Sequence, residues 1–248
     1  MNTENRKPSG LTIPEFINCW STLMKEVKEN HESLFALLNP RFDPQPQIES
    51  DEARIAELAH QYRAVAERKE PCITVCIKEI SDMTGGRLEH LETRMKEEDS
   101  LYRKLDKITK EKSLTPDEAV EELSDCVRYT YVTDTEHFTE HFLSFREELL
   151  KRGYVIVRVN NTIYDVTKPY RAVNCYVQDP EGYWFEVQFH TNESYAALRK
   201  THKMYREKRE VTTTPERRAE IDSQMIEIAR KTPVPENSEY ILTYLLKK

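Results

Sequence analysis

Apolar residues recur three or four positions apart along much of the chain, a spacing that places them on one face of a helix. The pattern predicts helices over 13–38, 51–68, 71–83, 100–110, 118–123, 136–152, 193–209 and 215–231. Gly85-Gly86 ends the third helix, and Gly153 follows 136–152 as a residue suited to a helix C-terminus. A proline-rich segment, 39–47, separates the first helix from the second.

Short runs of β-branched and aromatic residues lie between these helices, and such runs are typical of strands. They cover 88–95, 126–132, 155–164, 170–177 and 183–191. The last two are joined by the turn Gln-Asp-Pro-Glu-Gly and form a hairpin. About five strands between helices predict an α+β fold, in which a small mixed β-sheet is flanked by helices. We expect a central domain over 71–210, with helical extensions over 1–70 and 211–248.

The second strand of this hairpin alternates between apolar and polar residues. The alternating set is Phe185, Glu186, Val187, Gln188, Phe189 and His190. Successive side chains of a strand point to opposite faces, so the apolar residues share one face and the polar residues share the other. The polar face has two interpretations. It is either a half-solvated sheet surface or a site that needs a carboxylate, an amide and an imidazole in a row.

Composition narrows the classes of partner. The chain of 248 residues has a net charge of −7, which argues against broad non-specific attraction to nucleic acid but leaves a local basic groove open. The predicted helix 193–209 is strongly basic, with Arg199, Lys200, Lys203, Arg206, Lys208 and Arg209. We interpret it as a solvated face or as a contact for the phosphate backbone of a tRNA.

Cysteine usage and hydropathy indicate a compartment. Five cysteines are scattered along the chain, which is typical of reduced thiols in a cytosol-like compartment. No apolar run approaches the roughly 18 residues that span a bilayer, and residues 1–10 lack the apolar region of a secretory signal peptide. We expect a cytoplasmic protein without a membrane partner. Export by a route that reads other signals, and association into a homo-oligomer, stay open.

Two acids, Asp125 and Glu186, lie on or beside predicted central strands. A buried carboxylate needs a partner or a metal, and two on neighbouring strands make a seat for Mg²⁺, which prefers oxygen ligands. Basic residues surround the same region of the sequence: Arg87, Arg94, Lys96, Arg103, Lys104, Arg128, Lys168 and Arg171. Acids for a metal and cations for phosphates indicate a nucleotide-transfer site. Solvated surface charges are the alternative, because charged residues make up 33% of the chain.

Three motifs carry a family resemblance. They are Arg94-Met-Lys96 followed by Ser100-Leu-Tyr-Arg-Lys104-Leu, then Tyr170-x-x-x-Asn174, then Glu186-Val-Gln188 followed by Phe-His190-Thr. Over about 70–210 the chain resembles the RelA/SpoT-like nucleotidyltransferase (alarmone synthetase) family. It lacks the histidine–aspartate pair and the room for the hydrolase domain of long members, so it is similar to a stand-alone synthetase or a toxin-type member.

The resemblance implies a nucleotidyltransferase-like fold and a binding site for ATP. The adenine of ATP would lie between Arg94 and Arg128, and Lys96 and Lys104 would hold phosphates. Mg²⁺, the cofactor that the resemblance implies, would be bound by the two site acids, Asp125 and Glu186. Asp125 lies three residues before Arg128 where the family usually has five, which leaves its depth in the site open.

The resemblance also implies an acceptor site. Glu186 would orient or deprotonate a ribose 3′-hydroxyl, which attacks the β-phosphorus of ATP and releases AMP. Tyr170 would stack on the acceptor base, and the acceptor would also contact Asn174, Gln188 and His190. Asn174 stands where the family usually has histidine, so the acceptor preference stays open.

The sequence therefore predicts a Mg²⁺-dependent pyrophosphokinase that moves pyrophosphate from ATP to the 3′-hydroxyl of a nucleotide or of a tRNA. One alternative is a toxin or effector that uses the same fold for another nucleotide-dependent transfer. The other is a degenerate, non-catalytic nucleotide-binding module that uses its N-terminal helices as a partner surface.

Overall fold

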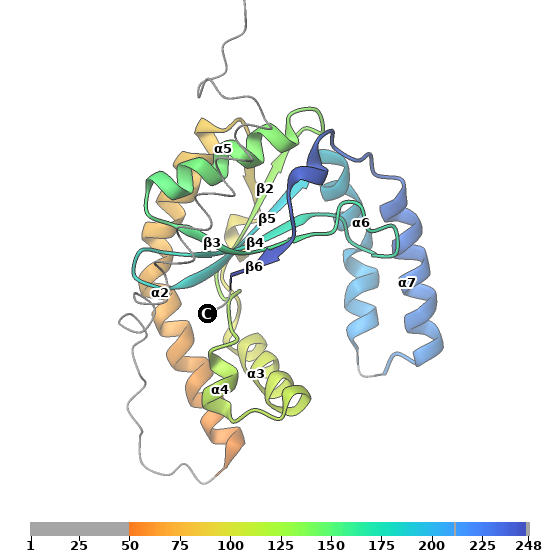
Figure 1. Cartoon of the computed structure of the whole chain (residues 1–248). Coiled ribbons are helices and arrows are strands. Elements are labelled where there is room, and N and C mark those ends of the chain that lie inside the picture. The colour runs from red at the N-terminus through yellow and green to blue at the C-terminus, as the bar shows by residue number, and fades with distance from the viewer. Residues whose placement is uncertain (1–49, 211, 247–248) are drawn as a thin grey trace, which may run out of the picture. The chain divides into compact units, whose positions relative to one another are not determined.

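The computed structural model describes residues 50–210 and 212–246. The predicted helix 13–38 and the proline-rich segment 39–47 lie outside these residues. The described part confirms an α+β fold with a mixed sheet flanked by helices (Figure 1). All the described residues up to Leu245 belong to one compact unit. The domain boundaries expected at residues 70 and 210 stay a prediction.

The sheet has six strands in the order β1-β2-β5-β4-β3-β6. Their bounds are β1 Arg87–Glu89, β2 Arg128–Thr133, β3 Val155–Asn161, β4 Val173–Gln178, β5 Trp184–Thr191 and β6 Tyr244–Leu245. The pair formed by β2 and β5 is parallel, and every other neighbouring pair is antiparallel. The hairpin of β4 and β5 confirms the prediction from the Gln-Asp-Pro-Glu-Gly turn. The short strand β6 was not predicted, so the segment after 210 is not wholly helical.

Six α-helices accompany the sheet among the described residues. They are α2 Asp51–Met83, α3 Glu98–Lys112, α4 Pro116–Val120, α5 Phe138–Lys151, α6 Asn192–Arg209 and α7 Pro215–Arg230. Short 3₁₀ turns cover Leu91–Thr93 and Ser238–Tyr240. Thr214 caps α7 by accepting a hydrogen bond from the backbone N–H of Arg217, and Pro215 fills the first helical position.

The predicted break between helices 51–68 and 71–83 is wrong, because α2 runs through it with Pro71 in its interior. A proline inside a helix costs roughly 3 kcal/mol. The helix nevertheless buries apolar residues on both sides of the proline, among them Leu58 and Ile73. Burial of a whole side chain contributes about 1.5–3 kcal/mol, so several such residues outweigh the proline.

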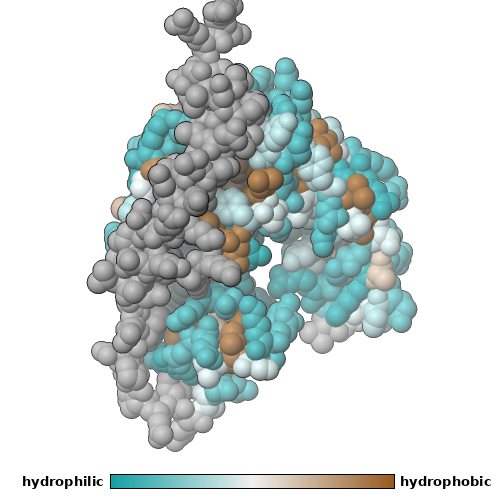
Figure 2. Space-filling model, viewed as in Figure 1, coloured by the Kyte–Doolittle hydropathy of each residue, from teal (hydrophilic) through white to brown (hydrophobic). Residues whose placement is uncertain are grey.

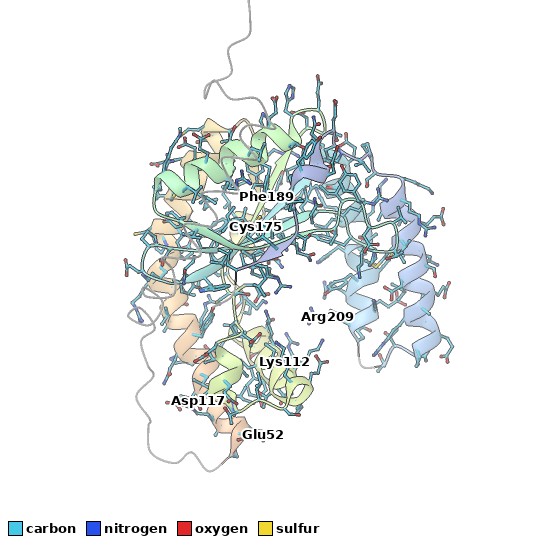
Figure 3. The ribbon with its side chains drawn as sticks, in the orientation of Figure 1. Glu52, Lys112, Asp117, Cys175, Phe189 and Arg209 are labelled. Carbon is cyan, nitrogen blue, oxygen red and sulfur yellow. The ribbon has the colours of Figure 1, made fainter. Side chains whose placement is uncertain are left out.

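One face of the sheet forms the core with α5 and α2. Phe189 of β5 packs against Phe142 and Phe145 of α5 with ring centroids 5.0 and 5.1 Å apart. Tyr131 of β2 joins the same cluster, and its hydroxyl contacts Thr84 at the end of α2. Phe189 and Cys175 mark the middle of the sheet in Figure 3. These aromatic side chains determine which face of the sheet is buried against the helices. The residues that alternate with them along each strand must therefore point to the opposite face.

The opposite face of the sheet is polar. Strand pairing places Arg128 of β2 beside Glu186 of β5, and Gln188 of β5 beside Asn174 of β4. No helix among the described residues is long and apolar enough to cross a membrane. In the space-filling view the surface is hollowed between the end formed by α3 and α4 and the pair formed by α6 and α7 (Figure 2). Both walls of this hollow are mostly hydrophilic.

Candidate active site

Asp125 lies just before β2 and is held between two lysines. Nζ of Lys96 and Nζ of Lys104 each lie 2.6 Å from a different carboxylate oxygen of Asp125. Burial alone would raise the pKa of Asp125, but the two ammonium groups outweigh burial and hold that pKa below its usual range. Burial lowers the pKa of Lys96 even with Asp125 beside it. The three groups form a compact, half-buried charge cluster.

Local backbone bonds bring the two lysines to Asp125. Lys96 donates its backbone N–H to the carbonyl of Cys126, and Arg128 donates to the carbonyl of Arg94. These two bonds hold the segment before α3 against the start of β2. Lys104 lies one turn after Ser100 on α3, whose Leu101 and Leu105 are buried and fix the rotation of the helix.

Glu186 is the buried acid of the polar face, with 4% of its surface exposed. Burial raises the pKa of its carboxyl above the usual range. Gln188, which donates to Glu186 Oε1 at 3.1 Å, and the positive charges of Arg128 and Lys96 counteract this rise, whereas the negative charge of Asp125 adds to it. The charge of Asp125 thus acts on Glu186, and the expectation that the two acids share a metal stays a prediction.

Arg94 and Arg128 differ in their surroundings. Arg128 is exposed and lies beside Glu186 across β2 and β5. Arg94 is instead anchored: its Nε donates to Glu70 of α2 and its Nη1 donates to the carbonyl of Leu91. The Glu70 carboxylate is itself buried. The expectation that the two arginines flank an adenine stays a prediction, and the anchor leaves Arg94 a fixed orientation from which to do so.

The four residues expected at the acceptor site lie on one face, on β4, on β5 and on the segment before β4. Tyr170 is half-buried, and its hydroxyl lies 3.0 Å from Asn174 Oδ1 and 3.0 Å from His190 Nε2. Gln188 pairs across the strands with Asn174. His190 is fully buried, with 0% exposure, and its Nδ1 is bonded to Ser194. Because His190 is buried, it can influence an acceptor through its hydrogen bond to Tyr170 and not by direct contact.

Comparisons with known proteins were made on the sequence and on the fold. No protein-family model and no curated protein matches the chain. The small alarmone synthetase 1 from Bacillus subtilis bound to its product pppGpp is similar in structure, with 16% identity, a TM-score of 0.47, and coverage of 68% of this chain and 86% of that one.

Two further solved structures are similar. A GTP pyrophosphokinase family protein from Streptococcus pneumoniae has 15% identity and a TM-score of 0.45, covering 70% of this chain and 85% of that one. The type VI effector Tas1, solved in complex with its immunity protein, has 18% identity and a TM-score of 0.41, covering 75% and 100%. These are alarmone-synthetase proteins and an effector, the two kinds of protein that the motifs resemble. Such remote likenesses carry no argument about activity, which must come from the residues themselves.

The structure adds two residues that sequence reasoning missed, Tyr176 of β4 and Arg158 of β3. Tyr176 pairs across the strands with Glu186, and the guanidinium of Arg158 lies 5.0 Å from the centre of its ring. A cation over an aromatic face stabilises both side chains. Period-two spacing from Asn174 already placed Tyr176 on the polar face. Nothing in the sequence pointed to Arg158, because β3 has a bulge between Ile156 and Arg158 that shifts its alternation.

Proposed function

We propose that this protein transfers pyrophosphate from ATP to the 3′-hydroxyl of an acceptor, releasing AMP. One observation carries the proposal. A buried carboxylate with a raised pKa, Glu186, feels the charge of a second acid, Asp125, which lies just before β2 and is held between two lysines. A base for a hydroxyl and a cationic seat for phosphates are the two parts that phosphoryl-type transfer needs.

Each group has a role in this proposal. Lys96 and Lys104 bind phosphate oxygens of ATP, since ammonium groups at that spacing already hold two carboxylate oxygens. Arg128, exposed beside Glu186, neutralises charge on the transferred group. Glu186 accepts the proton of the attacking hydroxyl, and its raised pKa brings it closer to the operating pH, where a general base works best. Tyr170 offers its half-buried ring to the acceptor base.

Magnesium fits the donor set of this site. Asp125 and Glu186 supply hard oxygen ligands, and no group of three or more potential metal ligands exists among the described residues. A hard cation that keeps waters and shares phosphate oxygens suits such a two-carboxylate site. When bound, Mg²⁺ would neutralise the charge on the phosphates. Both lysines hold Asp125, so this acid would be free to hold the ion where the lysines bind the phosphates of ATP instead.

A tRNA is a second candidate acceptor, favoured by the exposed cations of α6. Arg199, Lys200, Lys203, Arg206 and Arg209 are exposed along this helix. Arg209 of α6 and Lys112 of α3 are labelled at the two sides of the hollow in Figure 3. Cations in such a row bind a phosphate backbone and make the affinity strongly dependent on salt. A free nucleotide needs none of them.

The test is mass spectrometry of the products formed from ATP and Mg²⁺ with GDP, GTP, ADP or deacylated tRNA, each supplied separately. We expect AMP together with an acceptor that is heavier by two phosphates. Reversal of the charges on α6, for example Lys203→Glu with Arg206→Glu, should reduce transfer to tRNA and leave transfer to a free nucleotide unchanged.

Glu186→Gln is the matched control, because it keeps an oxygen that can accept the bond from Gln188 but cannot take a proton. Transfer by the wild type together with no transfer by the Glu186→Gln variant supports the proposal. If the wild type consumes no ATP with any of the four acceptors, the proposal is wrong and a non-catalytic nucleotide-binding module is favoured. If ATP is consumed without AMP release, a different nucleotide-dependent transfer is indicated.

A further inference from the structure

A chain of hydrogen bonds runs from the beginning of α6 to the polar face of the sheet. The hydroxyl of Ser194 lies 3.0 Å from Nδ1 of His190, and Nε2 of the same ring lies 3.0 Å from the hydroxyl of Tyr170. That hydroxyl lies 3.0 Å from Oδ1 of Asn174. Asn174 is half-buried, so its amide is the end of the chain that a ligand on the polar face can touch.

His190 forces all these bonds to point the same way. The ring has no exposed surface, and burial lowers the pKa of His190 to about 3. The imidazole is therefore neutral at any ordinary pH. A neutral imidazole donates from one nitrogen and accepts at the other. If His190 accepts from Ser194 it must donate to Tyr170, and if it donates to Ser194 it must accept from Tyr170.

Both directions satisfy every member of the chain. In the first, Ser194 donates to His190, His190 donates to Tyr170, and Tyr170 donates to Oδ1 of Asn174. In the second, each bond is reversed and the amide of Asn174 turns over so that its NH₂ group donates to Tyr170. Ser194 is satisfied here too, because its hydroxyl lies 3.3 Å from the carbonyl of Thr191 and can donate to it.

We propose that Ser194 and His190 are positioning residues that decide which half of the Asn174 amide faces the base of the receiving nucleotide. The proposal rests on the function proposed above. In the first direction the amide shows its NH₂ group, which complements a carbonyl such as O6 of guanine. In the second it shows its oxygen, which complements an amine such as N6 of adenine. A site with both directions available binds both purines.

The experiment compares GDP and ADP, by calorimetric affinity and by the rate of pyrophosphate transfer to each. For the wild type we expect the two nucleotides to differ by less than about tenfold. Ser194→Ala removes the partner of Nδ1. A buried N–H without a partner is rarer than a buried acceptor without one, so the ring proton stays on Nε2 and only the first direction remains.

Ser194→Ala should therefore raise the preference for GDP over ADP by about 5- to 10-fold, the effect of one neutral hydrogen bond. Asn174→Asp should shift the preference toward ADP, because a carboxylate only accepts. The added charge weakens the binding of GDP and ADP alike, so the ratio of the two affinities reports the recognition of the base.

Two controls separate positioning from simple support of α6. Ser223→Ala removes the same group from α7, where the hydroxyl donates to the carbonyl of Ala219, and should leave the ratio unchanged. Tyr170→Phe keeps the ring but breaks the chain, so adding Ser194→Ala in this background should no longer move the ratio. Ser194→Ala also removes the capping-box bond that Ser194 accepts from the backbone N–H of Thr191, and the loss of this bond alone would weaken the binding of both nucleotides together.

An unchanged ratio in Ser194→Ala overturns the inference, as does an equal shift in the Tyr170→Phe background. If the wild type binds and transfers to a nucleotide but no variant moves the ratio, the inference fails and the proposed function stands. If the wild type neither binds nor modifies any nucleotide, both fail.

Discussion

Asp125 lies between Lys96 and Lys104, where the proposed function places a phosphate of ATP. The carboxylate and each ammonium group are 2.6 Å apart, so the site without ATP neutralises its own cations. We therefore predict that Asp125→Asn binds ATP more tightly than the wild type when no metal is present. The expected gain is about tenfold, the size of a charge-assisted hydrogen bond that the phosphate no longer has to break. Calorimetry in the presence of a chelator measures it.

Glu186→Gln is the control for this gain. It also removes one negative charge from the site, but no lysine forms an ion pair with Glu186 among the described residues. Its gain in metal-free affinity should be smaller than that of Asp125→Asn. Equal gains would mean that ATP senses only the total charge, and that Asp125 does not compete for the lysines. Transfer activity with Mg²⁺ should be lost in both variants.

A second prediction concerns stability. A buried carboxylate with a raised pKa binds its proton more tightly in the folded state than in the unfolded state. The free energy of unfolding therefore falls as the pH rises from the pKa of Glu186 in the unfolded state to its pKa in the folded state. Above the folded-state pKa the whole loss is present. Glu186→Gln should stabilise the protein at pH 7 by on the order of 1 kcal/mol, and the gain should vanish below about pH 4. Urea unfolding at both pH values checks this, and a gain that persists in acid would contradict it.

A third prediction is the pH dependence of kcat/KM, which reports groups of the free enzyme. Activity should fall in acid as Glu186 takes up its proton, at a pH above the usual pKa of a glutamate. It should also fall in alkali as Lys96 loses its proton, below the usual pKa of a lysine. Lys96→Arg should remove the alkaline limb, because arginine keeps its charge, while the acid limb stays. A limb at the same alkaline pH in Lys96→Arg would assign it to another group.

The alternation on β5 was enough to predict the polar face and its acid. Aromatic and aliphatic residues at every second position have one stable placement, against the core, so the face of Glu186, Gln188 and His190 follows from the sequence. The resemblance alone singled out Asn174, and the register of the hairpin sets it beside Gln188. Alternation carries no information on depth, however. His190 lies wholly buried whereas Gln188 is half-buried, because α6 begins directly after β5 and its Ser194 covers the ring.

Contacts between distant segments were beyond the reach of the sequence. The spacing of Asp125 from Arg128 left the depth of this acid open, and the structure resolves it through Lys96 and Lys104, which come from two earlier segments. Pro71 indicated a helix end, yet tertiary burial along α2 overrides a local preference of roughly 3 kcal/mol. The partner of Arg94 was equally hidden, because Glu70 lies 24 residues away on a helix that the proline was expected to interrupt.

The pair of Glu70 and Arg94 gives the last prediction, which separates stability from ATP binding. Arg94→Ala leaves the buried carboxylate of Glu70 without its guanidinium, which should cost about 3 kcal/mol of unfolding free energy. The double variant Arg94→Ala with Glu70→Gln has no unpaired buried carboxylate and should recover most of the lost unfolding free energy. Lys231→Ala, which breaks an exposed pair with Glu227, should change stability by less than about 0.5 kcal/mol. If Arg94 lies against the adenine, both variants that lack it should bind ATP equally poorly although only one is unstable. ATP affinity that recovers together with stability would show that Arg94 supports the fold alone.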